Sequence, residues 1–342
     1  MRVTRESLLR IAKETVQERA YNDPDIVAAY LTGSLLTSDP MLGGTADIDI
    51  VFVTKEPPMK SREFVKLTPD FHLDIARRMK DEFKAPRELR GDPWLGFEMY
   101  APTLLYEREK FFDFVQASLR AGFEFEQPPL TLQRCNTLLS HGRGNWMDIS
   151  EFEGDAGPKE IRKFLKALFH AVNAIAELNG PPLWERRILL EFPARAEAAN
   201  KPGMVAAVYG LLGANRVDPD KVKGWVADWK SAYQVASATP GVDGRIHPIR
   251  LNYYEKSIKA LLAGDTPLAA LWPLLQTWTF SSEVLSGDHL QFWQTACSDL
   301  GLLGDGFRER VEGLDHLLDE IEITFEEIAT ANGLDTAQST GI

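Results

Sequence analysis

The chain has 342 residues, 44% of them hydrophobic and 26% charged, and its formal net charge is -12 at pH 7. This composition is typical of a globular protein, and the length favours two domains. The acidic charge argues against a long nucleic acid as the partner, because proteins that bind one usually present a broad basic surface.

Cysteine usage and hydropathy indicate the compartment. Cys135 and Cys297 lie far apart and match neither a metal-ligand spacing nor a disulfide framework, which favours a reducing environment. Charges interrupt the N-terminal stretch, which therefore does not resemble a signal peptide. The longest nearly apolar run, residues 204–214, is shorter than the roughly 20 residues that a membrane span needs. We expect a cytoplasmic protein that does not span a membrane.

The N-terminal part of the chain predicts a helix, several strands and a second helix. Residues 4–20 have the apolar spacing of an amphipathic helix, with Thr4 as its N-cap. Short apolar or alternating runs predict four strands, at residues 25–32, 46–53, 70–76 and 101–107. The second helix carries an apolar stripe and ends near Gly122.

After about residue 150, helical periodicity dominates. Pro158 stands where the first turn of a helix accepts proline, and Pro273 should kink or divide a helix predicted at residues 266–285. Apolar residues from Phe307 to Ile328 recur at alternating spacings of four and three, which is a heptad seam. We expect this seam to pack on its own domain, which favours a monomer, and keep a dimer interface as the alternative. Residues 333–342 are expected to form a disordered tail.

Three aspartates stand out on the predicted strands. Side chains alternate between the two faces of a strand, so Asp47 and Asp49 share one face, opposite an apolar face that includes Ile48 and Ile50. Asp74 lies on the polar face of the next predicted strand. If the two strands pair, the three carboxylates converge, which is tolerable when cations lie between them. Carboxylate oxygens favour Mg²⁺, and two ions about 4 Å apart can share such ligands.

Other residues near these strands favour phosphate binding. Gly33 and Ser34 form a turn whose backbone N–H groups can approach phosphate oxygens, and the serine can donate one more hydrogen bond. Arg77 and Arg78 follow the Asp74 strand directly and are candidates for stabilising a triphosphate. The equally weighted alternative is that these arginines begin a solvated helix.

This combination resembles a known superfamily. Gly33-Ser34, twelve residues, Asp47-Ile48-Asp49-Ile50 and a later Asp74 are similar to the motif of the nucleotidyltransferase superfamily of DNA polymerase β. Its smaller members include the kanamycin- and streptomycin-type adenylyltransferases and the minimal nucleotidyltransferases. The resemblance covers roughly residues 25–110. It implies that the Gly-Ser turn holds a triphosphate, that Asp47 and Asp49 bind two Mg²⁺ ions, and that Asp74 binds one ion and often activates the acceptor hydroxyl.

The resemblance also implies a fold and a reaction. The fold would be α+β, with a small mixed-sheet nucleotidyltransferase domain over residues 1–150 and an all-helical substrate-binding domain over residues 151–332. The reaction would move a nucleoside monophosphate, with AMP from ATP favoured, to a hydroxyl group of a small molecule. An aminoglycoside-like cation is one candidate acceptor.

Two sets of alternatives stay open. The chain could be a regulatory or non-catalytic nucleotide-binding module, or a nucleotidyltransferase that acts on a protein or an RNA end. Glu98 and Glu107 flank the fourth predicted strand and are alternatives to Asp74 as the general base. His72 shares the face of Asp74, and we expect it to be a surface histidine.

Overall fold

The computed structural model describes residues 3–108, 110–120 and 127–334, and the chain divides into two compact units, Met1–Glu124 and Phe125–Ile342. This division differs from the boundary at residue 150 that the sequence predicted. The helix α4 (Pro128–Ser150) belongs to the second unit, because it packs along α5 (Pro158–Ala176) and α12 (Asp305–Ala331).

The first unit contains a five-stranded mixed sheet with the strand order β3-β4-β2-β1-β5. The strands are β1 (Ile26–Thr32), β2 (Ala46–Thr54), β3 (Arg62–Lys66), β4 (Phe71–Met79) and β5 (Thr103–Glu107). Strands β2 and β4 are parallel, and the other neighbouring pairs are antiparallel. The α-helices of this unit are α1 (Arg5–Asn22), α2 (Leu95–Tyr100) and α3 (Phe111–Arg120).

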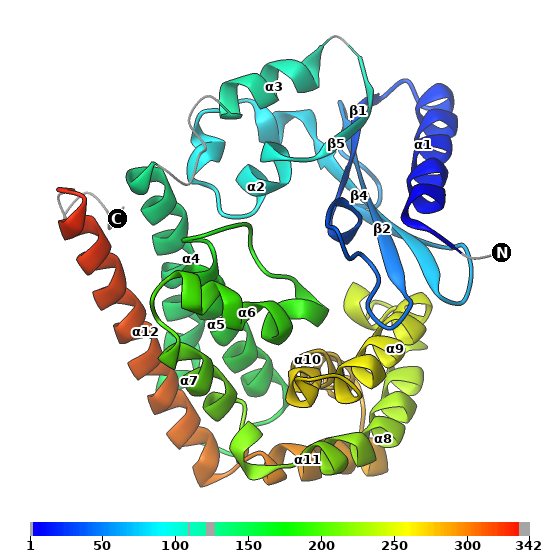
Figure 1. Ribbon diagram of the computed structural model, residues 1–342. Coiled ribbons are helices and arrows are strands. Elements are labelled where there is room, and N and C mark those ends of the chain that lie inside the picture. Colours follow the sequence, from blue (N-terminus) through cyan, green and yellow to red (C-terminus); the bar gives the residue numbers. More distant parts are fainter. Residues whose placement is uncertain (1–2, 109, 121–126, 335–342) are drawn as a thin grey trace. The chain divides into compact units, whose positions relative to one another are not determined.

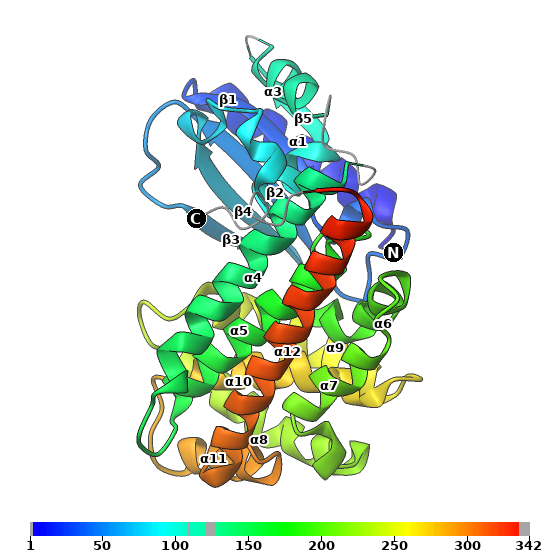
Figure 2. The same cartoon turned by 90° about the vertical axis from the view of Figure 1, so that its left-hand side faces the viewer.

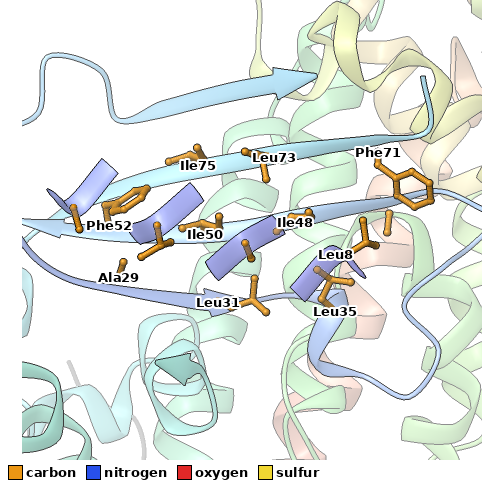
Figure 3. Close-up of a cluster of buried hydrophobic side chains, with 14 of the residues drawn as sticks. Leu8, Ala29, Leu31, Leu35, Ile48, Ile50, Phe52, Phe71, Leu73 and Ile75 are labelled. Carbon is orange, nitrogen blue, oxygen red and sulfur yellow. The ribbon is translucent and has the colours of Figure 1, made fainter. Parts of the chain in front are cut away.

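Helices cover both faces of this sheet (Figure 1). On one face, Leu8 and other residues of α1 pack against alternating strand residues that include Ile48 and Ile50 (Figure 3). Thr4 caps α1 as predicted, because its side chain accepts a hydrogen bond from the Ser7 N–H at 3.3 Å. On the other face, α2 and α3 pack against side chains of β1 and β2. The acidic positions of β2 therefore share a face with residues that α2 and α3 cover further along the strand.

The edge strand β3 was not predicted from the sequence. It pairs with β4 in antiparallel register, so that Phe64 lies opposite Asp74 and Lys66 lies opposite His72. The connecting turn is stabilised by the Thr68 side chain, which accepts hydrogen bonds from the N–H groups of Asp70 and Phe71 at 3.1 Å each. The strand predicted at residues 70–76 is therefore the fourth in chain order and the second strand of a hairpin.

The second unit is helical among its described residues. Besides α4, α5 and α12, it contains α6 (Ile188–Ala198), α7 (Gly203–Leu211), α8 (Pro219–Ser237), α9 (Leu251–Leu262), α10 (Leu271–Ser282) and α11 (Gly287–Asp299). Pro158 begins α5 as predicted. The segment around Pro273 is divided into a 3-10 turn, Pro267–Ala270, and α10, whose first turn contains the proline. Within the described ranges, no helix is both long and apolar enough to cross a membrane.

The heptad seam of α12 packs within its own unit. Its residues from Phe307 to Phe325 are buried, and the Phe307 ring lies 6.2 Å from the ring of Phe164 on α5. Helices α4, α5 and α12 run side by side (Figure 2). Of the predicted disordered tail, residues 335–342 lie outside the described residues.

Candidate functional site

The parallel pairing of β2 and β4 brings the three aspartates together. Their register places Asp49 opposite Asp74, and Asp47 opposite His72. One carboxylate oxygen from each of Asp47, Asp49 and Asp74 lies within 4.8 Å of the other two. Asp47 and Asp74 are buried and Asp49 is partly buried. The predicted convergence of these carboxylates is therefore present in the structure.

Gly33 is required by the position of Asp49. Thr32 is the last residue of β1 and pairs with Asp49, so Gly33 begins its turn directly beside that carboxylate. Its backbone has φ 76° and ψ -158°, a combination that essentially only glycine adopts. A Cβ atom on Gly33 would lie 1.9 Å from Oδ2 of Asp49, far inside van der Waals contact. The turn and the carboxylate therefore fit together only while residue 33 lacks a side chain.

Ser34 begins a 3-10 turn, Ser34–Leu36, in which the Thr37 N–H donates to the Ser34 carbonyl at 3.0 Å. The Ser34 Oγ is buried and has no hydrogen-bond partner among the described residues. A buried hydroxyl in that state is unfavourable unless a ligand or a water molecule supplies the partner. The serine that the sequence singled out for phosphate binding is thus available to accept or donate one more hydrogen bond.

Asp74 is paired with an arginine that the sequence analysis missed. The guanidinium group of Arg62 donates from Nε to Oδ1 at 2.7 Å and from Nη2 to Oδ2 at 2.6 Å. The Asp74 side chain is 2% exposed, whereas that of Arg62 is 51% exposed. The signal that could have found Arg62 is the Thr68-Pro69-Asp70 turn, since it separates two alternating segments and so predicts a hairpin.

The two arginines predicted to bind triphosphate lie away from the acidic cluster. Arg77 follows Leu73 and Ile75 in the alternation of β4, so it lies on the α1 face, where it contacts Glu63 at 3.4 Å. Arg78 is on the face of Asp74, but four residues, or about 13 Å, further along the strand. At these positions, Arg77 and Arg78 each form an ion pair with a glutamate of the first unit.

Arg78 belongs to a partly buried network with Glu98 and Tyr30. Its guanidinium group donates to both Glu98 oxygens, at 3.0 and 2.9 Å, and Tyr30 donates its O–H to Glu98 at 2.5 Å. Burial, together with the negative charge of Glu98, raises the pKa of Tyr30 well above its usual value, so Tyr30 is a neutral donor. The Glu98 carboxylate therefore lies with Arg78 and Tyr30, away from the three clustered aspartates.

The structure also shows the surroundings of Glu107 and His72. Glu107 accepts hydrogen bonds from the N–H groups of Phe112 and Asp113 at 3.2 and 3.4 Å, so it caps the start of α3. The expectation of a surface histidine at position 72 was wrong, since His72 is buried. The reason is the unpredicted strand β3, which pairs with β4 beside His72 and places Phe64 at a ring distance of 6.3 Å.

The donor set fits a hard divalent cation. All three clustered groups are carboxylates, which are the ligands that Mg²⁺ prefers. Ser34 and the Gly33 turn lie at the end of β1, beside Asp49. The arrangement can therefore hold a cation next to a turn suited to an anion.

The chain can also be compared with known families, curated proteins and solved structures. No protein-family model and no curated protein matches the chain. Among solved structures, the chain is similar to a nucleotidyltransferase-like protein from Exiguobacterium sibiricum 255-15, with 13% identity and a TM-score of 0.28 over 88% of this chain and 91% of that one.

Proposed function

We propose that this chain is a Mg²⁺-dependent nucleotidyltransferase that moves a nucleoside monophosphate from a nucleoside triphosphate to a hydroxyl group. The observation that carries the proposal is the joint arrangement of the three carboxylates with the Gly33 turn, whose backbone conformation is compatible only with glycine. Three carboxylates with oxygens within 4.8 Å of one another repel, and a divalent cation between them would relieve this repulsion.

Each residue has a role in this reaction. Asp47, Asp49 and Asp74 would hold two Mg²⁺ ions, which when bound would neutralise the phosphates and polarise the group being transferred. Gly33 lets the backbone of the turn approach the triphosphate, and the Ser34 Oγ donates a hydrogen bond to a phosphate oxygen. Asp74 accepts the proton of the attacking hydroxyl group. The hydroxyl oxygen bonds to the α-phosphorus as the bond to the β-phosphate oxygen breaks, and pyrophosphate leaves.

For the substrates, we propose ATP as the nucleotide and a small, cationic molecule, such as an aminoglycoside-like compound, as the acceptor. The support is electrostatic. Residues 151–342 hold 18 Lys and Arg against 27 Asp and Glu, an acidic balance that attracts cations and disfavours long polynucleotides.

A thermal-shift panel tests the proposal. Each of the four ribonucleoside triphosphates is added with Mg²⁺ or with excess chelator, and we expect a rise in melting temperature only when Mg²⁺ is present. Transfer of an α-labelled phosphate to candidate acceptors, with release of pyrophosphate, then tests turnover. Equal shifts with Mg²⁺ and with chelator, or no shift with any triphosphate, would contradict the proposal.

A further inference from the structure

The pair between Arg62 and Asp74 lies at the proposed metal site. Both oxygens of the Asp74 carboxylate accept a hydrogen bond from the same guanidinium group. A divalent ion that uses either oxygen would stand close to that positive charge, and the two cations would repel each other. Metal binding at Asp74 is therefore coupled to the position of Arg62.

We propose that Arg62 is an internal counter-cation, which holds Asp74 in the metal-free protein and has to leave this carboxylate when a divalent ion binds. The inference rests on the proposed function, since it concerns the same carboxylates. It makes Arg62 a positioning residue that regulates how strongly the site binds metal.

The surroundings of Arg62 permit this exchange. Among the described strands, β3 is at the edge of the sheet and pairs with β4, and Arg62 is the first residue of β3. The Arg62 side chain is 51% exposed, whereas the Asp74 side chain is 2% exposed. The ring of Phe64 lies 5.5 Å from the guanidinium carbon and gives this cation a second favourable contact. The arginine can thus move while the carboxylate stays in place.

The proposal predicts a change that a merely structural role cannot produce. If Arg62 only stabilised the sheet, Arg62→Gln would leave metal affinity unchanged or weaken it. If Arg62 competes with the metal, the same substitution should strengthen metal binding and lower the stability of the metal-free protein. The substitution removes a positive charge that lies within 2.7 Å of both Asp74 oxygens and would repel the metal, so we expect Mn²⁺ to bind about tenfold or more tightly.

A matched control is available on the opposite face of the sheet. Arg19 of α1 binds Glu63 through two hydrogen bonds, of 2.7 and 2.9 Å, so Arg19→Gln removes a similar ion pair and the same charge. Mn²⁺ alone is titrated by calorimetry into four chelator-treated proteins: the wild type, Arg62→Gln, Arg62→Lys and Arg19→Gln. The melting temperature of each metal-free protein is also measured.

We expect tighter Mn²⁺ binding for Arg62→Gln and an affinity within about twofold of wild type for Arg19→Gln. Arg62→Lys keeps the charge but loses the two-point contact, so its affinity should lie between those of wild type and Arg62→Gln. Unchanged or weaker binding by a folded Arg62→Gln variant, beside a wild type that binds Mn²⁺, would overturn this inference and leave the proposed function intact. A wild type that binds no Mn²⁺ would overturn both.

Discussion

The carboxylate of Asp49 occupies the space that a side chain at position 33 would need, since a Cβ atom on Gly33 would lie 1.9 Å from Oδ2. One residue of the turn thereby determines where an acidic group of the neighbouring strand can lie. The position of the proposed phosphate-binding turn is therefore coupled to that of the proposed metal-binding cluster.

Gly33→Ala should disrupt both the turn and the carboxylate cluster. The substitution strains a backbone conformation that suits only glycine and displaces Asp49, so we expect a loss of about 1–3 kcal/mol in stability and a strong loss of Mn²⁺ binding. Gly44→Ala is the control, since Gly44 also has a positive φ of 73° but has no atom within 4 Å of an added Cβ. It should lose about 1–2 kcal/mol and keep its metal affinity. Equal metal affinity in the two variants would contradict the coupling.

Asp47→Asn and Asp49→Asn should abolish turnover and sharply weaken metal-dependent binding of nucleotide, because each replaces a charged ligand with a neutral one of the same shape. The measurement is Mg²⁺-nucleotide titration of each variant followed by its melting temperature. Asp81→Asn removes the same charge from an exposed pair with Lys84 and should bind as the wild type does. Unchanged nucleotide binding in the Asp47 and Asp49 variants would rule out the metal site.

Ser34→Ala should separate ligand binding from stability. Because the buried Ser34 Oγ has no hydrogen-bond partner among the described residues, removing it should not destabilise the protein without ligand. It should weaken nucleotide binding by about 1 kcal/mol, or roughly fivefold, through the loss of one hydrogen bond. Calorimetric titration and a melting curve measure the two effects. Lower stability with normal affinity would assign the hydroxyl a structural role.

The stability of the second unit should depend on pH through His170. Burial of this α5 residue, with smaller contributions from His141 and Lys166, lowers the pKa of His170 from 6.5 to about 4. Between these values the unfolded chain binds a proton that the folded protein does not, so stability rises with pH across this window and is lost as the pH falls toward 4.

The measurement is urea unfolding at about pH 4.5 and pH 7. His170→Gln removes this titration, so the difference in unfolding free energy between the two pH values should shrink by up to roughly 3 kcal/mol relative to wild type. An identical pH dependence in the variant would show that His170 is not responsible.

Leu318→Ala tests the role of the α12 seam. Leu318 is fully buried, so we expect the variant to lose about 2–5 kcal/mol in stability while the protein stays monomeric, because the seam packs within its own unit. Light scattering at micromolar concentration gives the mass of both proteins. A wild-type dimer that dissociates on Leu318→Ala would place the seam at an interface between subunits.

Local sequence determined much of this protein. The capped helix at Thr4, the strands that carry the aspartates, the proline at the start of α5 and the seam of α12 follow from side-chain periodicity and capping, which act over a few residues. Period-two alternation also placed Asp47 and Asp49 on one face. The acidic character of the candidate site was therefore predictable from the amino-acid sequence.

Tertiary structure alone decided which groups complete the site. The parallel register that sets Asp49 opposite Asp74 depends on pairing between distant segments, and so do the edge strand that buries His72 and the approach of Arg62 to Asp74. The position of Arg77 also depends on the fold. It lies on the same face of β4 as Leu73 and Ile75, which is the α1 face, and contacts Glu63 there. Charge and spacing along the chain show which residues can bind an ion or a phosphate, but the free energy of strand pairing selects which partner each of them meets.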